Sequence, residues 1–164
     1  MKTILLILAI VIGTAFAADG YKIKQEFSAP KTGTLVRCVD AMNERDQKRL
    51  IELLEHVQTW AAEFAKKEGI KLATEKMPER IVFIDAPLAW EGLLTAEPVA
   101  GRSEPKRDRI VINFNDNTET LLHEFGHWFF GEAASDQHER THALCDDFRD
   151  YCWPKWREIK KAIK

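Results

Sequence analysis

Residues His123, Glu124 and His127 have the types and spacing that metal-dependent hydrolysis requires. They belong to the segment His-Glu-Phe-Gly-His at positions 123–127. On an α-helix, positions i and i+4 lie about 40° apart around the axis and roughly 6 Å apart along it. Two imidazoles can therefore reach one metal ion from one helix face, and the carboxylate can take a proton from water beside it. The pattern predicts His123 and His127 as ligands of zinc and Glu124 as the general base.

A third ligand is expected from the next helix, where His138 and His142 repeat the same pattern. His142 is the preferred ligand because it lies a full turn inside that helix, with Asp146 four residues later on the same face. His138 is the alternative, and Asp146 or Glu139 also remain open as ligands. If His142 is the ligand, Asp146 is expected to accept an N–H from a ligand histidine, with His123 preferred.

The apolar periodicity predicts the helices and strands that surround these residues. Short runs of β-branched and aromatic residues predict strands at 34–39, 80–85 and 109–114. Apolar residues spaced three and four apart predict a long amphipathic helix from about Asn43 to Glu68, which Gly69 ends. Residues 97–108 contain two prolines, a glycine and several charges, and they are expected to form an exposed connection.

The motif itself lies on a predicted helix, Thr118–Phe130, which Gly131 ends and for which residues 115–117 offer N-cap side chains. A further helix is predicted from about Asp136 to Trp153, where Pro154 interrupts it. These elements predict an α+β fold. A small twisted mixed sheet would pack on a long N-terminal helix and on the motif helix, and a C-terminal helix would carry the third ligand.

Residues 115–151 resemble the zincin metallopeptidases, in particular the gluzincin-like group whose third ligand comes from the following helix. In that group a glutamate is followed four residues later by an acidic residue that orients a zinc-bound histidine. His142 and Asp146 fit this layout, with histidine in place of glutamate. The motif and the stretch Ala143–Tyr151 are also loosely similar to the anthrax lethal-factor-like proteases. The metzincin extension is absent, because Ala133 stands where its third histidine would fall.

The resemblance implies a zincin-like fold and peptide-bond hydrolysis, with zinc as the cofactor and Glu124 as the base that activates its water. Three neutral imidazoles leave zinc more positive than two imidazoles and a carboxylate, which favours ionisation of that water. A peptide or protein substrate is expected to pair with an edge strand, either the strand 80–85 or one near 93–100. The identity of the substrate stays open.

Two other classes of protein remain open. Glu124 with His127, and Glu139 with His142, form two Glu-x-x-His pairs, an arrangement that di-iron and di-manganese carboxylate bundles use. The predicted strands argue against such a bundle, which needs long helices with two further glutamates. Alternatively, all four histidines between 123 and 142 would close a structural zinc site in a non-catalytic binding module or protease relic. Glu124 argues against this reading, because a purely structural site has no use for that carboxylate.

The N-terminal residues 1–17 have the features of a secretory signal peptide: one lysine, an apolar run and an Ala-Phe-Ala ending. The mature chain is expected at 18–164, as a single domain that is secreted or periplasmic and monomeric, with no stable membrane insertion. Without Lys2, the 24 basic residues fall to 23 against 26 acidic ones, a net charge of −3. That balance gives no reason to expect binding to nucleic acid.

Three cysteines remain in the mature chain. In an oxidising compartment, we expect one disulfide from Cys38 to either Cys145 or Cys152, which leaves one thiol. Cys145 and Cys152 are separated by about 10 Å of helical rise, so they cannot easily bond to each other. The alternative is three buried free thiols.

The C-terminal segment Lys155–Lys164 places Trp156, Ile159 and Ile163 on one helical stripe among basic residues. A terminal helix that packs onto the domain is preferred over a contact with a membrane surface.

Overall fold

The computed structural model describes residues 21–85, 100–113, 118–131 and 138–163, with side chains from Thr141 onward in the last segment. The predicted signal peptide, the caps at 115–117 and most of the predicted strand near 93–100 lie outside the described residues. Within this part of the chain, no helix combines the length and the apolar character that a membrane crossing requires.

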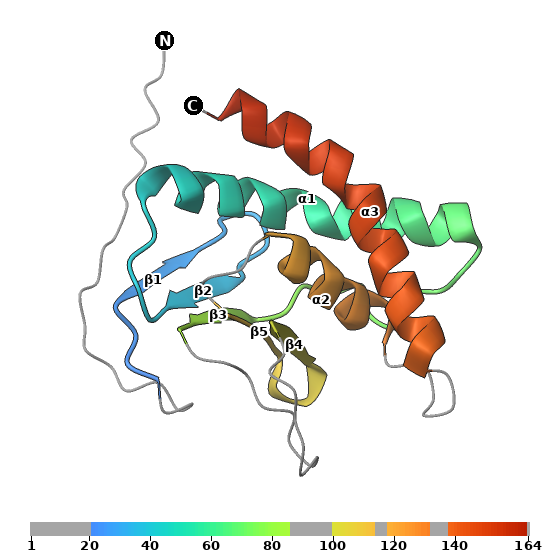
Figure 1. Cartoon of the computed structure of the whole chain (residues 1–164), viewed down its shortest axis with the longest axis horizontal. Coiled ribbons are helices and arrows are strands. Elements are labelled where there is room, and N and C mark those ends of the chain that lie inside the picture. Colours follow the sequence, from blue (N-terminus) through green and yellow to red (C-terminus); the bar gives the residue numbers. More distant parts are fainter. Residues whose placement is uncertain (1–20, 86–99, 114–117, 132–137, 164) are drawn as a thin grey trace.

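The described residues form an α+β fold of three α-helices and one five-stranded mixed sheet (Figure 1). The strands lie in the order β1-β2-β3-β5-β4. Parallel pairing joins β2 to β3 and β3 to β5, and antiparallel pairing adds β1 and β4 at the two edges. The strands are β1 Gln25–Ser28, β2 Leu35–Cys38, β3 Arg80–Ile84, β4 Gly101–Glu104 and β5 Arg109–Asn113. A single 3-10 turn, Pro105–Arg107, connects β4 to β5.

The helices are α1 Glu44–Glu68, α2 Thr118–Phe130 and α3 His138–Ala162. The side chain of Asn43 caps α1 by accepting a hydrogen bond from the Asp46 backbone N–H at 2.9 Å. Gly69 ends α1 with a φ of 68°, a left-handed conformation that glycine adopts without strain. The predicted bounds of the long helix and of the motif helix are therefore confirmed.

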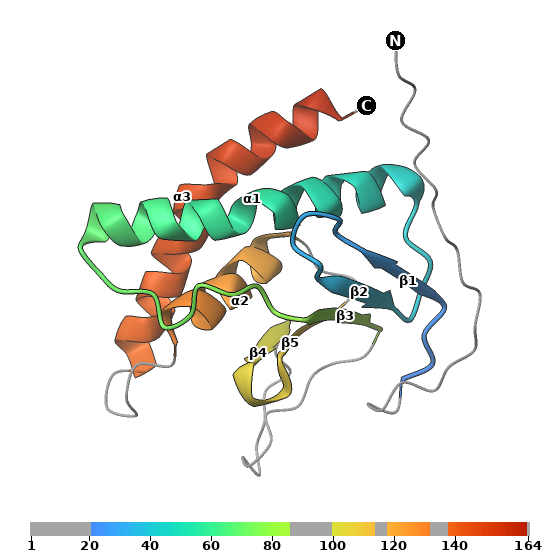
Figure 2. The same ribbon diagram turned by 180° about the vertical axis from the view of Figure 1, so that it is seen from behind.

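The main core lies between the sheet and the helices, which occupy the same side of the sheet in both views (Figures 1 and 2). Ile81 and Phe83 of β3 face this core, whereas Val82 and Ile84 belong to a second apolar cluster with Val111. Successive residues of a strand point to opposite faces. β3 is buried on both faces, and this explains why its sequence is a continuous apolar run.

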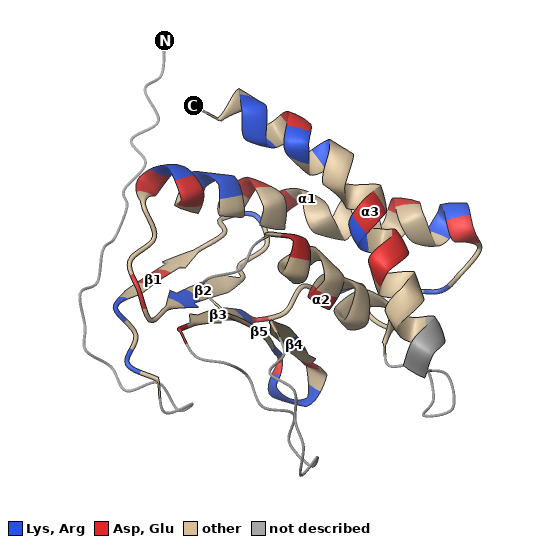
Figure 3. Ribbon diagram, viewed as in Figure 1, with Lys and Arg blue, Asp and Glu red and all other residues tan. Residues whose placement is uncertain are grey.

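The prediction that Pro154 interrupts the last helix is wrong, because α3 continues to Ala162. Proline lacks one backbone N–H and its ring crowds the preceding turn, so the helix bends instead of ending (Figures 1 and 2). Cys152 and Trp156 are 0 % and 2 % exposed in the core, so they fix α3 on both sides of the proline. The C-terminal segment therefore packs onto the domain, with its basic residues concentrated near the end of α3 (Figure 3).

The prediction that residues 97–108 form an exposed connection is also wrong in part. Residues 101–104 form the edge strand β4, although their sequence, Gly-Arg-Ser-Glu, contains no apolar side chain. Pairing with β5 and an ion pair between buried Arg109 and Glu104, with a Nε–Oε2 distance of 2.5 Å, hold this strand in place.

The expected disulfide is absent: Cys38, Cys145 and Cys152, all among the described residues, are free and buried. Cys145 packs against Gly126 of α2, and Cys152 lies with Cys38 in the core. Burial raises the pKa of Cys38 and of Cys145 to about 12. These thiols therefore remain protonated at neutral pH and serve as apolar packing groups.

Candidate metal centre

The motif helix α2 has its apolar side chains on one face and its histidines on another. Leu121, Leu122, Phe125 and Phe129 are at most 1 % exposed and face the core. His123 and His127 lie on another face and are half-buried. The glycine of the motif has a packing role, because a Cβ at Gly126 would lie 2.8 Å from both Cα and Cβ of Cys145. Gly126 thus allows α3 to approach α2 closely beside the histidines.

Three histidines converge at this contact between α2 and α3. One ring nitrogen from each of His123, His127 and His142 lies within 4.8 Å of the others. The Nε2 atom of His123 is 3.2 Å from Nε2 of His127 and 3.2 Å from Nδ1 of His142. Two nitrogens that bind one zinc ion tetrahedrally at about 2.0–2.1 Å are roughly 3.3 Å apart. The cluster therefore has a spacing that suits a divalent ion with imidazole ligands.

Asp146 fixes the orientation of the His123 ring. The Nδ1–H group of His123 donates to Oδ1 of Asp146 at 2.9 Å, which leaves the Nε2 lone pair directed at the other two imidazoles. Arg149 donates to the same carboxylate oxygen at 2.8 Å. Asp146 thus occupies the supporting position that the sequence indicates, and Arg149 in turn holds Asp146.

Glu124 follows His123 on α2 and is only 7 % exposed. Burial raises the pKa of its carboxyl group to about 7, although the backbone N–H of Ser103 and the charge of Arg102 act in the opposite direction. Gly101 packs directly against this side chain, since a Cβ there would lie 2.8 Å from Cγ of Glu124. The carboxylate therefore sits between the motif helix and the edge strand β4.

The sheet topology corrects one expectation about the substrate strand. The strand 80–85 cannot serve as an edge, because β3 lies between β2 and β5. β4 is an edge strand, and Asn113 of β5 donates to the carbonyl of Ala100 at 2.8 Å. In an antiparallel ladder, residues that bond to the neighbouring strand alternate with residues whose backbone groups point away from it. Since Ala100 bonds to Asn113, the backbone groups of Gly101 and Ser103 point away from β5. The Ser103 N–H donates to Glu124, and the Gly101 groups are directed outward.

The structure brings four of the predicted site residues together, His123, His127, His142 and Asp146, and it places Glu124, which follows His123 on α2, against β4. For His138 and Glu139, the described structure gives only the start of α3 and no side chain. Sequence reasoning missed Gly101, Ser103 and Arg149. Arg149 lies three residues after Asp146, a spacing at which side chains on a helix are neighbours, so its contact with Asp146 is predictable from the sequence. Gly101 and Ser103 belong to β4, whose polar sequence contains no pattern that predicts a strand or a site.

Comparisons with known proteins add no family assignment: no protein-family model, no curated protein and no solved structure matches this chain.

Proposed function

We propose that this chain is a zinc-dependent metallopeptidase of the zincin type, exported after removal of residues 1–17. The observation that carries the proposal is the combination of three converging imidazoles with a buried carboxylate beside a sheet edge. A structural zinc site would need the histidines alone. Glu124, at 7 % exposure and bonded to β4, is costly to bury, and general-base catalysis gives it a use.

The proposed ligands are His123, His127 and His142, with Asp146 holding the His123 ring in the required tautomer. Zinc would supply Lewis acidity, which polarises a carbonyl oxygen and lowers the pKa of water toward about 7. Glu124 takes the proton from the attacking water at a carboxylate oxygen and then delivers it to the leaving amine. The hydrogen bond from the Ser103 N–H would fix the orientation of that carboxylate.

The proposed substrate is an extended peptide segment that adds to the edge of β4. The outward backbone groups of Gly101 offer one donor and one acceptor to such a strand. Glu124 lies against the same residue, so a peptide bond paired there would be close to the base. Main-chain pairing is largely independent of side chains, which is consistent with a protease that accepts many sequences.

A peptide-library cleavage assay with the Glu124→Gln variant tests this function. The variant should bind zinc as wild type does and lose at least about 100-fold in hydrolysis, the range that a general base contributes. Glu119→Gln is the matched control, because Glu119 is exposed on the same helix. Full metal-dependent activity in Glu124→Gln would contradict the role of the base. Cleavage of no peptide by the zinc-loaded wild type would favour the non-catalytic zinc module.

The fold disfavours the di-iron or di-manganese alternative. Such sites lie inside bundles of four long helices, whereas here α2 has 13 residues and packs beside a five-stranded sheet. Metal analysis separates the two classes, since the proposal requires one zinc per chain and the alternative two redox-active ions. Export is tested by N-terminal sequencing of the secreted protein, which should begin at Ala18 or Asp19.

A further inference from the structure

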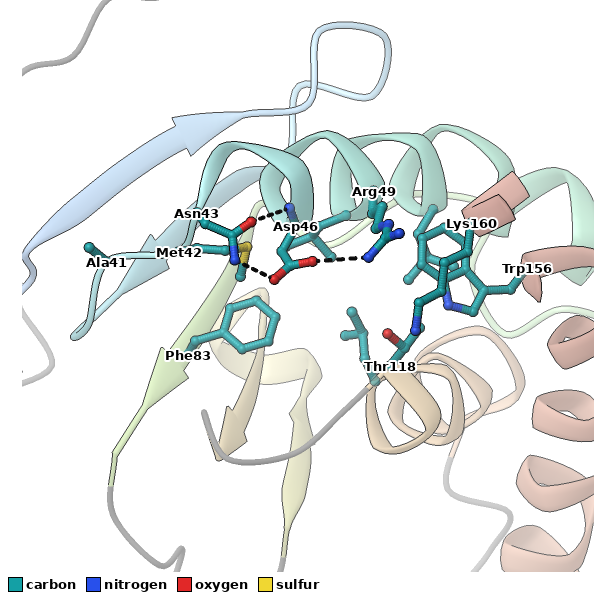
Figure 4. A pocket seen from close by; sticks show the side chains of 12 residues that line it. Ala41, Met42, Asn43, Asp46, Arg49, Phe83, Thr118, Trp156 and Lys160 are labelled. Carbon is teal, nitrogen blue, oxygen red and sulfur yellow. Dashed lines mark hydrogen bonds and ion pairs between the residues drawn. The ribbon is translucent and has the colours of Figure 1, made fainter. Parts of the chain in front are cut away.

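A second site lies on the other side of α2 from the histidines. The N-terminal part of α1, the end of β3, the start of α2 and the C-terminal part of α3 enclose a pocket of about 280 Å³ (Figure 4). Thr118 and Leu121 line it from α2, and at 100° per residue they lie about 120° or more around the helix from His123 and His127. The pocket is therefore separate from the candidate metal centre.

The pocket contains hydrogen-bond donors that lack acceptors. The Trp156 side chain is 2 % exposed and lines the pocket, and its Nε1–H group has no partner among the described residues. The buried Nε of Arg49 also has no partner in this part of the chain. The remaining contacts of Arg49 are long, 3.4 Å to Asp46 and 3.4 Å to the Ile163 carbonyl. Buried donors without acceptors are costly, so a ligand that supplies acceptor atoms is favoured.

The charges at the pocket favour an anion. Arg49 and Lys160 contribute two positive charges, and Figure 4 shows both side chains on the same side of the pocket as Trp156. Among the described lining residues Asp46 is the one acidic side chain, and its carboxylate already accepts from Asn43 at 2.7 Å. The N-terminus of α2, at Thr118, adds a positive helix dipole. A cationic ligand would leave the donors of Trp156 and Arg49 unpaired.

The remaining lining residues are apolar, so the part of the ligand that contacts them is expected to be apolar. Leu50, Leu53, Phe83 and Leu121 are at most 7 % exposed. A volume of about 280 Å³ lies just below the range of roughly 300–1,000 Å³ that small-molecule pockets occupy, so the ligand is small. We propose that this pocket binds a small carboxylic acid with an apolar body of about eight carbon atoms, the carboxylate accepting from Arg49 and Trp156 and the body contacting the leucines and Phe83.

Octanoate is the probe, and octanol is its neutral match. In NMR spectra of the ¹⁵N-labelled chain, octanoate should shift the Trp156 indole N–H resonance, which the Trp156→Phe variant identifies by its absence. For a ligand of this size we expect a Kd of roughly 0.1–1 mM. Octanol should bind at least about tenfold more weakly, because it cannot form the charge-assisted bond to Arg49. No indole shift at 10 mM octanoate, or equal binding of octanol, would overturn the proposal.

Two variants locate the carboxylate. Arg49→Gln should weaken octanoate binding by about tenfold or more and leave octanol binding unchanged. Arg45→Gln, an exposed position one turn earlier on α1, is the matched control and should bind as wild type does. Lys160→Gln, at an exposed residue, should weaken octanoate by about two- to fivefold with the fold intact. Unchanged octanoate affinity in both Arg49→Gln and Lys160→Gln would refute the site. Glu124→Gln should leave octanoate binding unchanged, so this test is independent of the proposed peptidase activity.

Discussion

Replacing Gly126 by alanine should separate α2 from α3 and weaken zinc binding. The added Cβ would lie 2.8 Å from Cα and Cβ of Cys145. Carbon atoms in contact are normally about 3.5–4.0 Å apart, so the helices must separate by roughly 0.7–1.2 Å at this point. His142 lies one turn before Cys145 and moves with it. Its Nδ1, now 3.2 Å from Nε2 of His123, would then be about 4 Å away, longer than the roughly 3.3 Å that separates two ligand nitrogens of one tetrahedral zinc ion.

The size of the effect can be estimated for folding and for metal binding. Overpacking costs about 1–3 kcal/mol, and the better helix propensity of alanine offsets about 1 kcal/mol of that. The unfolding free energy of the zinc-free chain should therefore fall by roughly 0–2 kcal/mol. Zinc affinity should fall at least about tenfold, the lower end of losses caused by disturbing the support of a metal ligand.

Urea unfolding of the chelator-treated protein measures the first quantity, and competition with a chromogenic zinc chelator measures the second. A Gly126→Ala variant that binds zinc as tightly as wild type would contradict this expectation. In that case the close contact between α2 and α3 would not hold the imidazoles in place.

Three further predictions concern the surroundings of the cluster. Gly101→Ala places a Cβ 2.8 Å from Cγ of Glu124, so we expect the rate of peptide hydrolysis to fall about tenfold or more. Zinc affinity, measured by chelator competition, should stay at the wild-type value, and an equal fall in zinc affinity would contradict this prediction. Asp146→Asn should lower zinc affinity about 10–100-fold, whereas Asp150→Asn, 69 % exposed, should not, and equal behaviour of the two would exclude the supporting role. Burial acts to raise the pKa of Glu104, but the arginines bonded to it outweigh this effect and hold the pKa below 4.5. The contribution of Glu104 to the stability of the fold is therefore present above pH 4.5 and is lost as the pH falls through its pKa in the folded protein. Glu104→Gln should therefore lower the free energy of unfolding at pH 7 and make it fall less steeply below about pH 4.5. An unchanged pH profile of urea midpoints would contradict this.

The sequence predicts those helices and strands whose apolar residues follow a single pattern, either the helical 3–4 spacing or a continuous β-branched run. The 3–4 spacing in residues 44–68 and 118–130 and the β-branched runs of β3 and β5 give helices and strands near their observed bounds. β4 was missed because Gly-Arg-Ser-Glu carries no apolar alternation, and its strand pairing depends on β5 and on buried ion pairs. α3 was predicted too short, since the burial of Trp156 beyond Pro154 depends on distant residues of the core.

The same distinction applies to the candidate site. The local spacing of His123 and His127 is enough to place both on one helix face. Their distance from His142 depends on how α2 and α3 cross, which Gly126 and Cys145 determine through a contact that no local pattern reveals. The preference for His142 rested on helix position, and the observed cluster includes it. The choice of edge strand requires the order of the sheet, which the three predicted strands at 34–39, 80–85 and 109–114, all interior, do not supply.

The zinc content of the purified chain, measured for wild type and for His142→Ala after equilibration with limiting zinc and a competing chelator, shows whether the three imidazoles hold one ion. We predict one zinc per wild-type chain and a large loss of affinity in His142→Ala. A wild-type chain that retains no zinc, or a His142→Ala variant that retains it as tightly as wild type, would contradict the proposed metal centre.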